Sequence, residues 1–215
     1  MPNATVDWDL ATLSFIVRAT WPIRAGEQVT IGYIDLGYSR AHRQRELSRR
    51  YKFTCKCKAC APGDEARIPY SDLRRAILIR SAVERELDDA AFEEWIASGA
   101  PVGGIVGFDG GYYTQILQQI AAMNGFSRAQ LTYSFMEEEG YFRDGLWEAV
   151  LVRLVKGYSV LQDETAVRKY AITAALLKQA DTGSDGGWWD VARNPTKTEW
   201  WGKLGPRQVR AEKVR

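Results

Sequence analysis

Three cysteines, Cys55, Cys57 and Cys60, lie within six residues and are the only cysteines of the chain. Their C-x-C-x-x-C spacing lets three thiolates converge on one ion from a single turn of chain. Soft thiolates suit zinc best, and a structural zinc site takes four ligands. The single histidine, His42, is expected to be an exposed helix residue rather than the fourth ligand, because helical spacing directs it with neighbouring arginines. We therefore predict a zinc site for which this chain supplies three ligands.

The same cysteines allow two other interpretations. They could be small buried apolar positions without a metal, or a zinc knuckle for nucleic acid, although a knuckle also takes a fourth ligand. The fourth position of a three-thiolate site could be filled by water, by an outside residue or by nothing.

The composition limits the class of protein. The chain has 215 residues, is 46% hydrophobic and 26% charged, and carries a net charge of +2. Cysteines confined to one cluster exclude a secreted disulfide framework. No run approaches the roughly 20 apolar residues of a membrane span, and residues 1–7 are neither a signal region nor a transit peptide. We expect an intracellular protein, in the nucleus and/or the cytoplasm, with no membrane partner.

Two β-strands are expected before the cysteines. Apolar residues alternate in residues 12–20 and again in 28–34, which is the pattern of half-buried strands. Pro22 and Gly26 supply a turn between them, so the two strands should form a hairpin. The residues on the apolar faces are Leu13, Phe15, Val17 and Ala19, then Val29, Ile31 and Tyr33.

A basic helix should follow, capped by Ser39 and running to about Arg50. Residues 40–58 hold eight basic side chains against one acidic, a net charge of +7. We interpret this segment as a solvated basic helix; contact with phosphate or with an acidic substrate is the alternative. Nucleic acid is not the expected partner, because no interleaved aromatics or known recognition helix accompany the charge.

From residue 61 onward the chain is expected to be helical. The predicted helices, with the residues that begin or end them, are a long helix capped by Ser71, a helix over 112–124 ending at Gly125, one with a Ser127–Gln130 capping box ending near Gly140, one over 143–161, and one over 164–180 capped by Asp163. The glycine-rich residues 99–111 should form a loop. The short connection at 162–163 predicts that the last two helices are antiparallel.

Ordered motifs in the first sixty residues resemble the second half of a SET domain, the protein-lysine methyltransferase fold, of the SET-and-MYND type and its fungal relatives. The motifs are Pro2-Asn3-Ala4, Ile23 to Thr30, Tyr33-Ile34-Asp35, Arg43 to Leu47, and Tyr51-Lys52-Phe53 followed by the three cysteines. Each is weak alone, but their order and spacing are specific. The helical remainder is similar to the C-terminal helical region of such proteins.

The resemblance implies S-adenosylmethionine as methyl donor and a lysine of a histone or non-histone protein as substrate. It gives Tyr33 the role of catalytic tyrosine, Asn3 and Phe53 a place at the donor, and Tyr51 a place along the lysine channel. It makes the cysteines the post-SET zinc ligands. Without the resemblance, Tyr33 would be a core residue, Tyr51 and Phe53 ordinary packing, and Asn3 a turn residue.

The family's N-H-S-C motif and its glycine motif would precede Pro2. We therefore expect that the chain starts at an internal methionine of a longer protein, and that the isolated chain, with most of the donor pocket missing, does not turn over.

The predicted fold class is α+β: a partial SET-type β subdomain (1–53), a cysteine motif and linker (54–63), an α-helical domain (64–202) and a basic tail (203–215). Residues 147–174 resemble a tetratricopeptide-type helix pair, which would make a concave surface for a partner peptide. The competing interpretation of the whole chain is thus a non-catalytic interaction module. Two tryptophan pairs, at 188–189 and 200–201, are expected to fasten the tail to the helices rather than to form a ligand cage.

Overall fold

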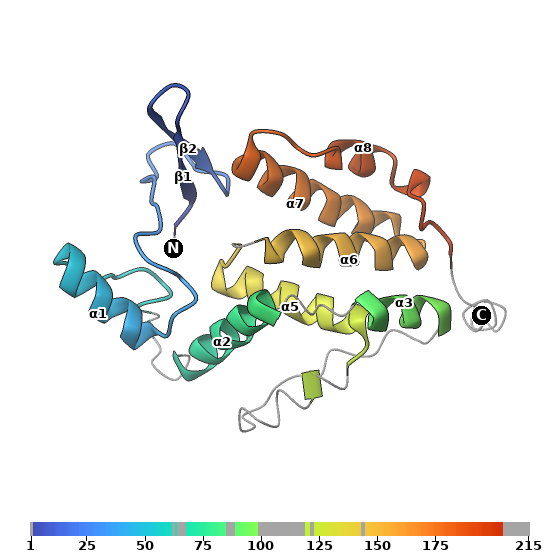
Figure 1. Ribbon diagram of the computed structural model, residues 1–215, viewed down its shortest axis with the longest axis horizontal. Helices are drawn as coiled ribbons and strands as arrows, with labels where there is room; N and C mark the ends of the chain where they lie inside the picture. The colour runs from blue at the N-terminus through green and yellow to red at the C-terminus, as the bar shows by residue number, and fades with distance from the viewer. Residues whose placement is uncertain are drawn as a thin grey trace.

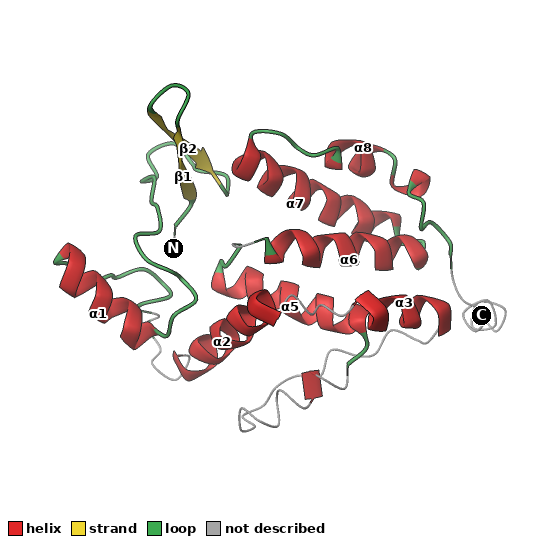
Figure 2. Ribbon diagram, viewed as in Figure 1, coloured by secondary structure: helices red, strands yellow, loops and turns green. Residues whose placement is uncertain are grey.

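The α+β class is confirmed by a computed structural model, in which a small two-stranded sheet precedes a layered set of helices (Figures 1 and 2). The structure describes residues 2–61, 63, 68–84, 89–98, 119–120, 123–142 and 145–203. The expected loop at 99–111, most of the expected helix at 112–124 and nearly all of the basic tail lie outside the described residues. Among the described helices, none combines the length and the apolar character that crossing a membrane requires.

The sheet consists of β1 (Ala4–Asp9) and β2 (Ser14–Ala19), paired antiparallel with Ala4 opposite Ala19. A strand within 12–20 is confirmed, but its predicted partner is wrong. Asp9 closes the turn before β2, because its carboxylate accepts hydrogen bonds from the Ala11 amide at 2.9 Å and the Thr12 hydroxyl at 2.6 Å. This local turn lets β2 fold back on the strand just before it.

Residues 28–34 lie outside the sheet as irregular chain, with a bend at 33–34. The segment meets β1 at Thr30, whose carbonyl accepts from the amides of Asn3 at 3.0 Å and Ala4 at 3.1 Å. Within the described residues, strands are confined to β1 and β2. The strand predicted from the alternating pattern of 28–34 is therefore wrong.

The apolar face of the hairpin is exposed, which differs from the expected half-buried strand. Phe15 is 70% exposed and packs edge-to-face on Trp8, 47% exposed, with ring centroids 4.7 Å apart. Val6 and Val17 lie opposite each other on the same face and are exposed as well. Period-2 alternation predicts that one face is apolar, but it does not say what covers that face.

Helix α1 (Arg40–Tyr51) confirms the predicted basic helix and its cap. The Ser39 hydroxyl accepts from the His42 amide at 3.4 Å, and the helix ends at Lys52, which takes a left-handed φ of 60°. Its inner face buries Arg43 and Leu47. Arg40 and Gln44 are half-buried beside them, whereas Arg45, Ser48 and Arg49 are exposed on the opposite side.

The remaining helices form the layers seen in Figure 1. They are α2 (Ile68–Glu84), α3 (Asp89–Ser98), α5 (Gly125–Glu139), α6 (Leu146–Val160), α7 (Glu164–Thr182), α8 (Trp188–Arg193) and a 3-10 turn (Pro195–Lys197). Helices α6 and α7 pack side by side across a connection of three residues, which confirms the antiparallel pair.

The predicted helix caps are partly right. Asp163 caps α7 by accepting from the Ala166 amide at 2.9 Å, and Gly140 ends α5 with a left-handed φ of 57°. The α5 start is wrong: Asn124 is the cap, since its side chain accepts from the Ser127 amide at 2.8 Å. Gly125 is thus the first residue of α5 and not the residue that ends a helix. The side chain that caps α5 is that of Asn124, three residues before Ser127.

The first turn of α2 also differs from the sequence expectation. The helix begins at Ile68, so Ser71 lies inside it and is not its cap. The Ser71 hydroxyl instead donates to the Glu139 carboxylate at 2.6 Å. The Ser71 hydroxyl thus bonds to a residue of another helix, instead of accepting from a backbone amide of its own helix as a cap would.

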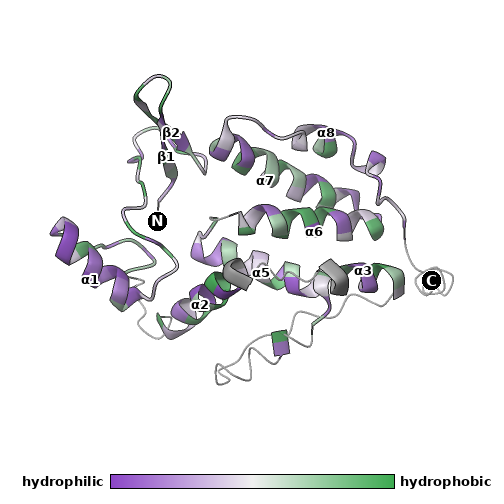
Figure 3. Ribbon diagram, in the orientation of Figure 1, coloured by the Kyte–Doolittle hydropathy of each residue, from purple (hydrophilic) through white to green (hydrophobic). Residues whose placement is uncertain are grey.

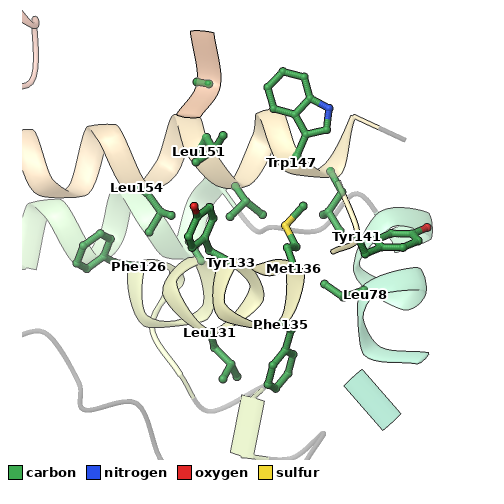
Figure 4. Packing of buried hydrophobic residues seen from close by; sticks show 14 of the residues in the cluster. Leu78, Phe126, Leu131, Tyr133, Phe135, Met136, Tyr141, Trp147, Leu151 and Leu154 are labelled. Atoms are coloured by element: carbon green, nitrogen blue, oxygen red, sulfur yellow. The ribbon is translucent and has the colours of Figure 1, made fainter. Parts of the chain in front are cut away.

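The main core lies between α5 and α6 and extends to α2 and α3 (Figure 4). Side chains that are fully buried there include Leu78, Phe126, Met136, Leu151 and Leu154. A smaller cluster around Val155, Val167, Ala171 and Ala192 packs against Trp188, Trp189 and Trp201. The amine of Lys156 also lies 4.8 Å from the ring centroid of Trp200. The tryptophans thus hold the C-terminal segment on α7 and α6, as expected.

Replacing Gly157 by alanine should lower the free energy of unfolding by about 1–3 kcal/mol. A Cβ at this position would lie 2.2 Å from two ring carbons of Phe126, which is fully buried. That ring stacks on Trp95 with centroids 4.7 Å apart and meets Tyr158 edge-on at 5.1 Å. These two neighbours restrain the ring on both sides, so it cannot shift away from the new Cβ without disturbing them. Urea unfolding followed by circular dichroism measures the change.

The control is Gln179→Ala, an exposed change on α7 expected to stay within about 0.5 kcal/mol of the unchanged protein. A Gly157→Ala protein that becomes more stable, as helix propensity alone would make it, would contradict this account of the α5–α6 packing.

Candidate metal and methyl-transfer site

The structure brings the three predicted metal ligands together. The Sγ atoms of Cys55, Cys57 and Cys60 lie within 4.8 Å of one another. A tight turn produces this arrangement, because the amides of Cys60 and Ala61 both donate to the Cys57 carbonyl, at 2.9 and 2.8 Å. Three thiols at this spacing are a donor set suited to a thiophilic metal ion.

Helix α1 holds the cysteine segment in place. The Gln44 side chain donates to the Cys55 carbonyl at 2.8 Å and accepts from its amide at 3.0 Å. Arg43 donates to the carbonyls of Tyr38 and, at 2.9 Å, Ala59. Arg40 donates to the Cys60 carbonyl at 2.6 Å. The cluster is therefore held through its backbone, and the thiols contact one another as well as Arg43 at Cys60 and the Ala59 backbone at Cys57.

The thiols are not equivalent. A hydrogen bond from the Cys60 thiol, helped by one from Cys55, lowers the pKa of Cys57 to about 4. The same contact and burial raise the pKa of Cys60. Without a metal, Cys57 therefore carries the negative charge of the cluster at neutral pH, and thiolate is the form that binds metal.

His42 does not belong to this cluster. Its ring lies over that of Tyr38, with centroids 4.2 Å apart, and its Nδ1 is 3.2 Å from the Arg45 guanidinium. Among the described residues, the group that could hold a metal at this point consists of the three cysteines alone.

Three aromatic residues predicted from the resemblance also meet. The Tyr33 ring lies edge-on to Tyr51, with centroids 5.1 Å apart, and to Phe53 at 6.0 Å. The Tyr51 hydroxyl donates to the Tyr33 carbonyl at 3.1 Å, which ties the end of α1 to the segment 28–34. Tyr33 is 53% exposed, so the alternative of a buried core tyrosine is wrong.

A cavity of about 190 Å³ joins the aromatic residues to the cysteines. Tyr33 and Phe53 line it together with the three cysteines, and Pro2 and Thr30 line it from the β1 side. The walls are mostly apolar, with Arg43, Arg75 and Glu139 as the charged exceptions. A pocket with this lining accommodates an apolar or aromatic group beside a thiol cluster.

Asn3 is not among the residues that line the cavity. It is buried, and its carboxamide accepts from the Thr30 amide at 2.8 Å and donates to the Gln28 carbonyl at 3.0 Å. The structure thus gives Asn3 a positioning role: it holds the start of the segment that carries Tyr33. Its assignment to the methyl donor stays a prediction.

Sequence reasoning missed a buried ionic group below the cysteines. The Glu139 side chain is 3% exposed and lies 2.7 Å from Arg74 and 2.9 Å from Arg75, whose side chain is 2% exposed. Arg75 also donates to the carbonyls of Leu36 and, at 3.0 Å, Glu139. Burial lowers the pKa of Arg75 and nearby Arg43 adds to this, whereas Glu139 opposes it. The group joins the helical domain to the segment before α1.

No protein-family model matches the chain. Over 74 residues it is 35% identical to histone-lysine N-methyltransferase set5 of Schizosaccharomyces pombe, a stretch that covers 34% of this chain and 23% of that protein. Over 89 residues it is 32% identical to histone-lysine N-methyltransferase SET5 of Scheffersomyces stipitis, covering 41% and 18%. Over 49 residues it is 43% identical to human N-lysine methyltransferase SMYD2, covering 23% and 11%.

The chain thus spans less than a quarter of the length of these curated relatives. All of these relatives are named as lysine methyltransferases. The cluster of three cysteines found here is consistent with the post-SET segment that the sequence motifs resemble. Over the matched stretches the chain is similar to SET-domain lysine methyltransferases, and its three-cysteine cluster is consistent with the C-terminal part of a SET domain.

Proposed function

We propose that this chain is the C-terminal portion of a protein-lysine N-methyltransferase that uses S-adenosylmethionine and acts on a histone or non-histone protein. The observation that carries the proposal is the meeting of Tyr33 and Phe53 with the three cysteines on one cavity, with the Tyr51 ring packed edge-on against Tyr33. Tyr51, Phe53 and the cysteines all lie within residues 51–60, so the fold's own contribution is to bring Tyr33, from the segment before α1, against them.

Methyl transfer needs a neutral amine, an in-line path and groups that stabilise charge near the departing donor. When bound, S-adenosylmethionine supplies the methyl group. In the proposal the Tyr33 hydroxyl faces the reacting atoms, the ring of Tyr51 lines the lysine channel, and Phe53 stacks near the adenine. Asn3 completes the donor side. The hydrogen bond from Tyr51 to the Tyr33 carbonyl keeps the two tyrosines in fixed relation.

The cysteines would hold zinc as a structural ion that stabilises the turn below Phe53. The proposal keeps the division of the chain into a partial SET domain (1–53), a cysteine motif (54–63), a helical domain (64–202) and a basic tail (203–215). It places the protein in the nucleus and/or the cytoplasm, where protein lysines are available as substrates.

The test uses the natural polypeptide that carries this chain, purified with whatever segments accompany it, and tritium-labelled S-adenosylmethionine with candidate protein substrates. Tyr33→Phe should lower the rate of methyl transfer by about 100-fold or more, because it removes a hydroxyl placed at the reacting atoms. The matched control is Tyr38→Phe, whose ring packs on His42 away from the cavity. Equal rates for Tyr33→Phe and the control would refute the assignment.

The isolated chain is expected to show no transfer in the same assay. Methylation of any protein lysine by the isolated chain would overturn that expectation without touching the role of Tyr33.

A second candidate is a non-catalytic interaction module, favoured by a groove of about 480 Å³ between the end of β2 and α7. Trp21, Pro22 and Leu176 give this groove an apolar lining, and Leu176 is 48% exposed. A peptide retained in the groove, together with no affinity of the natural polypeptide for S-adenosylmethionine, would favour this candidate over the enzyme.

A further inference from the structure

Six cations lie exposed on α1 and on the turn that follows it. We call this surface the basic face; its members are Arg45, Arg49, Arg50, Lys52, Lys56 and Lys58. Helix α1 stands at the edge of the molecule, apart from α6 and α7, and is coloured largely as hydrophilic in Figure 3. The basic face thus gathers six exposed cations from one helix and the turn that follows it.

The packing of α1 explains why Arg45 and Arg49 point outward together, whereas Arg50 follows Arg43 and Leu47 along the inner stripe and is exposed near the end of the helix. Arg43 is 2% exposed and Leu47 is 5% exposed, and both lie on the inner side of the helix. Arg45 and Arg49 are four residues apart, so they share one side of the helix, turned away from that buried pair. A helix of twelve residues is about 18 Å long. Within the helix the basic face runs from Arg45 to Arg50, about 8 Å along the axis, and the three lysines of the following turn extend it beyond the helix end.

The chain's own residues balance little of this charge. Glu46 is the only acidic residue in 40–58. Its carboxylate lies 3.2 Å from the Arg49 guanidinium and 2.7 Å from that of Arg50, so two cations share one anion. The hydrogen bond from Arg49 lowers the pKa of Glu46, which keeps it ionised and already engaged. The basic face as a whole remains strongly positive and solvent-facing.

The shape of the charge distribution favours a short anionic partner over a long one. Residues 1–60 carry ten basic and five acidic side chains, whereas residues 61–215 carry nineteen basic and twenty-two acidic, a net charge of −3. A nucleic acid long enough to bind firmly would extend past the basic face toward a net acidic remainder. An extended acidic segment of about six residues already covers 18 Å.

Apolar side chains stand at one end of the same surface. Tyr51 and Phe53 flank Lys52 and are 43% and 40% exposed. A partner with acidic residues next to a large apolar residue would pair its carboxylates with the cations and place the apolar group on these rings. A nucleic acid would stack its bases on the same rings, but the basic face would still offer its phosphates only a short run of cations.

We propose that the basic face of α1 docks a short acidic segment of a partner protein, with an apolar side chain of that segment resting on Tyr51 and Phe53. This docking shares the rings of Tyr51 and Phe53 with the proposed methyl-transfer site, whereas the six cations lie outside the cavity, so the loss of binding in a cation variant reports on docking and not on methyl transfer.

The test measures fluorescence anisotropy of a labelled peptide with six glutamates and a terminal leucine, titrated with the full chain. A peptide with glutamines in place of the glutamates is the ligand control. Binding of the acidic peptide should weaken at least about tenfold between about 50 and 200 mM salt, as charge pairing requires. The triple variant Arg45→Gln, Arg50→Gln, Lys52→Gln should weaken it at least about tenfold more.

The protein control is Lys169→Gln, Arg193→Gln, Lys197→Gln, which removes three exposed cations from the helical domain and should leave affinity unchanged. All six positions are exposed, so both triple variants should fold, and circular dichroism checks this. No binding of the acidic peptide at low salt, or equal losses in the two triple variants, would overturn the proposal. Tighter binding of a duplex or single-stranded oligonucleotide than of the peptide would overturn it in favour of nucleic acid.

Discussion

Replacing Glu139 by glutamine is expected to lower the free energy of unfolding by about 3–5 kcal/mol, because it removes one partner of a buried ionic group and leaves the other charged. The carboxylate accepts from the Ser71 hydroxyl at 2.6 Å and from Arg74 at 2.7 Å, and it lies 2.9 Å from Arg75. Glutamine keeps the size of the side chain but offers one acceptor oxygen and no charge. Urea unfolding followed by circular dichroism gives the difference.

The neighbouring residue provides the control. Glu138 pairs with the same Arg74 at 3.3 Å, but its side chain is 55% exposed. Glu138→Gln should therefore cost no more than about 1 kcal/mol, as exposed ion pairs usually do. Equal losses of unfolding free energy for Glu138→Gln and Glu139→Gln would show that burial does not determine how much each carboxylate contributes to stability.

A second variant separates an unpaired charge from general damage to the core. Replacing both Arg75 and Glu139 by methionine removes the charges together and fills similar volume. The double variant should be destabilised by less than the sum of the two single changes, because neither charge is left without its partner. A loss equal to that sum would mean that the two side chains act independently.

The buried ionic group of Glu139 with Arg74 and Arg75 could not be predicted from the sequence. Glu139 ends a run of three glutamates, and nothing local distinguishes it from its neighbours. Its partners lie 64 to 68 residues away, so its burial depends on how α5 and α2 pack. Periodicity places a residue on a face of its own helix, but it does not identify the helix that covers that face.

Features set by nearby residues were predicted well. The basic helix with its Ser39 cap, the Asp163 cap of α7 and the end of α5 at Gly140 all depend on contacts within four residues. The wrong assignments depend on a competing residue or a distant one. Asn124 preceded Ser127 as a cap, and β2 paired with the strand before it rather than with 28–34.

The candidate site was predicted partly from nearby residues and partly from the family resemblance. The cysteine spacing alone predicted that three thiols would meet, because a turn of six residues permits it. The meeting of Tyr33 with Tyr51 and Phe53 followed from the family resemblance, since alternation alone placed Tyr33 in a core. Its measured exposure shows why: the segment lies outside the sheet, so the alternating pattern carries no information on burial there.

Supplying zinc to the metal-free chain should order the cysteine segment and α1 while leaving the helical bundle nearly unchanged. The main core is built from α2, α3, α5, α6 and α7, and its buried members include none of the cysteines and no residue of α1. The cysteine segment depends instead on Gln44, Arg43 and Arg40 and on whatever bridges the thiols. Bound metal would supply that bridge, with binding energy that appears as folding energy of the segment.

Hydrogen exchange measures this directly. With zinc, protection should rise at the amides of Cys60 and Ala61 and along α1, and should change little in α6 and α7. Metal analysis should find one zinc per chain. In Cys57→Ser the zinc affinity should fall by more than about 100-fold, which exceeds the loss usual for residues that only support a ligand. Lys58→Gln, an exposed change between two ligands, should bind as the unchanged chain does.

Two results would contradict this view of the site. If Cys57→Ser kept its zinc, the ion would be held by a different set of residues, and the turn at 57–61 would owe its shape to backbone hydrogen bonds alone. If zinc instead raised protection throughout the bundle, the segment and the bundle would fold as one unit. Two contacts could transmit such coupling: Arg75 contacts both Glu139 and the Leu36 carbonyl, and the Arg40 amide at the start of α1 donates to the Asp72 carboxylate of α2 at 2.6 Å. Repeating the exchange in Glu139→Gln would then show how much of the coupling passes through Arg75.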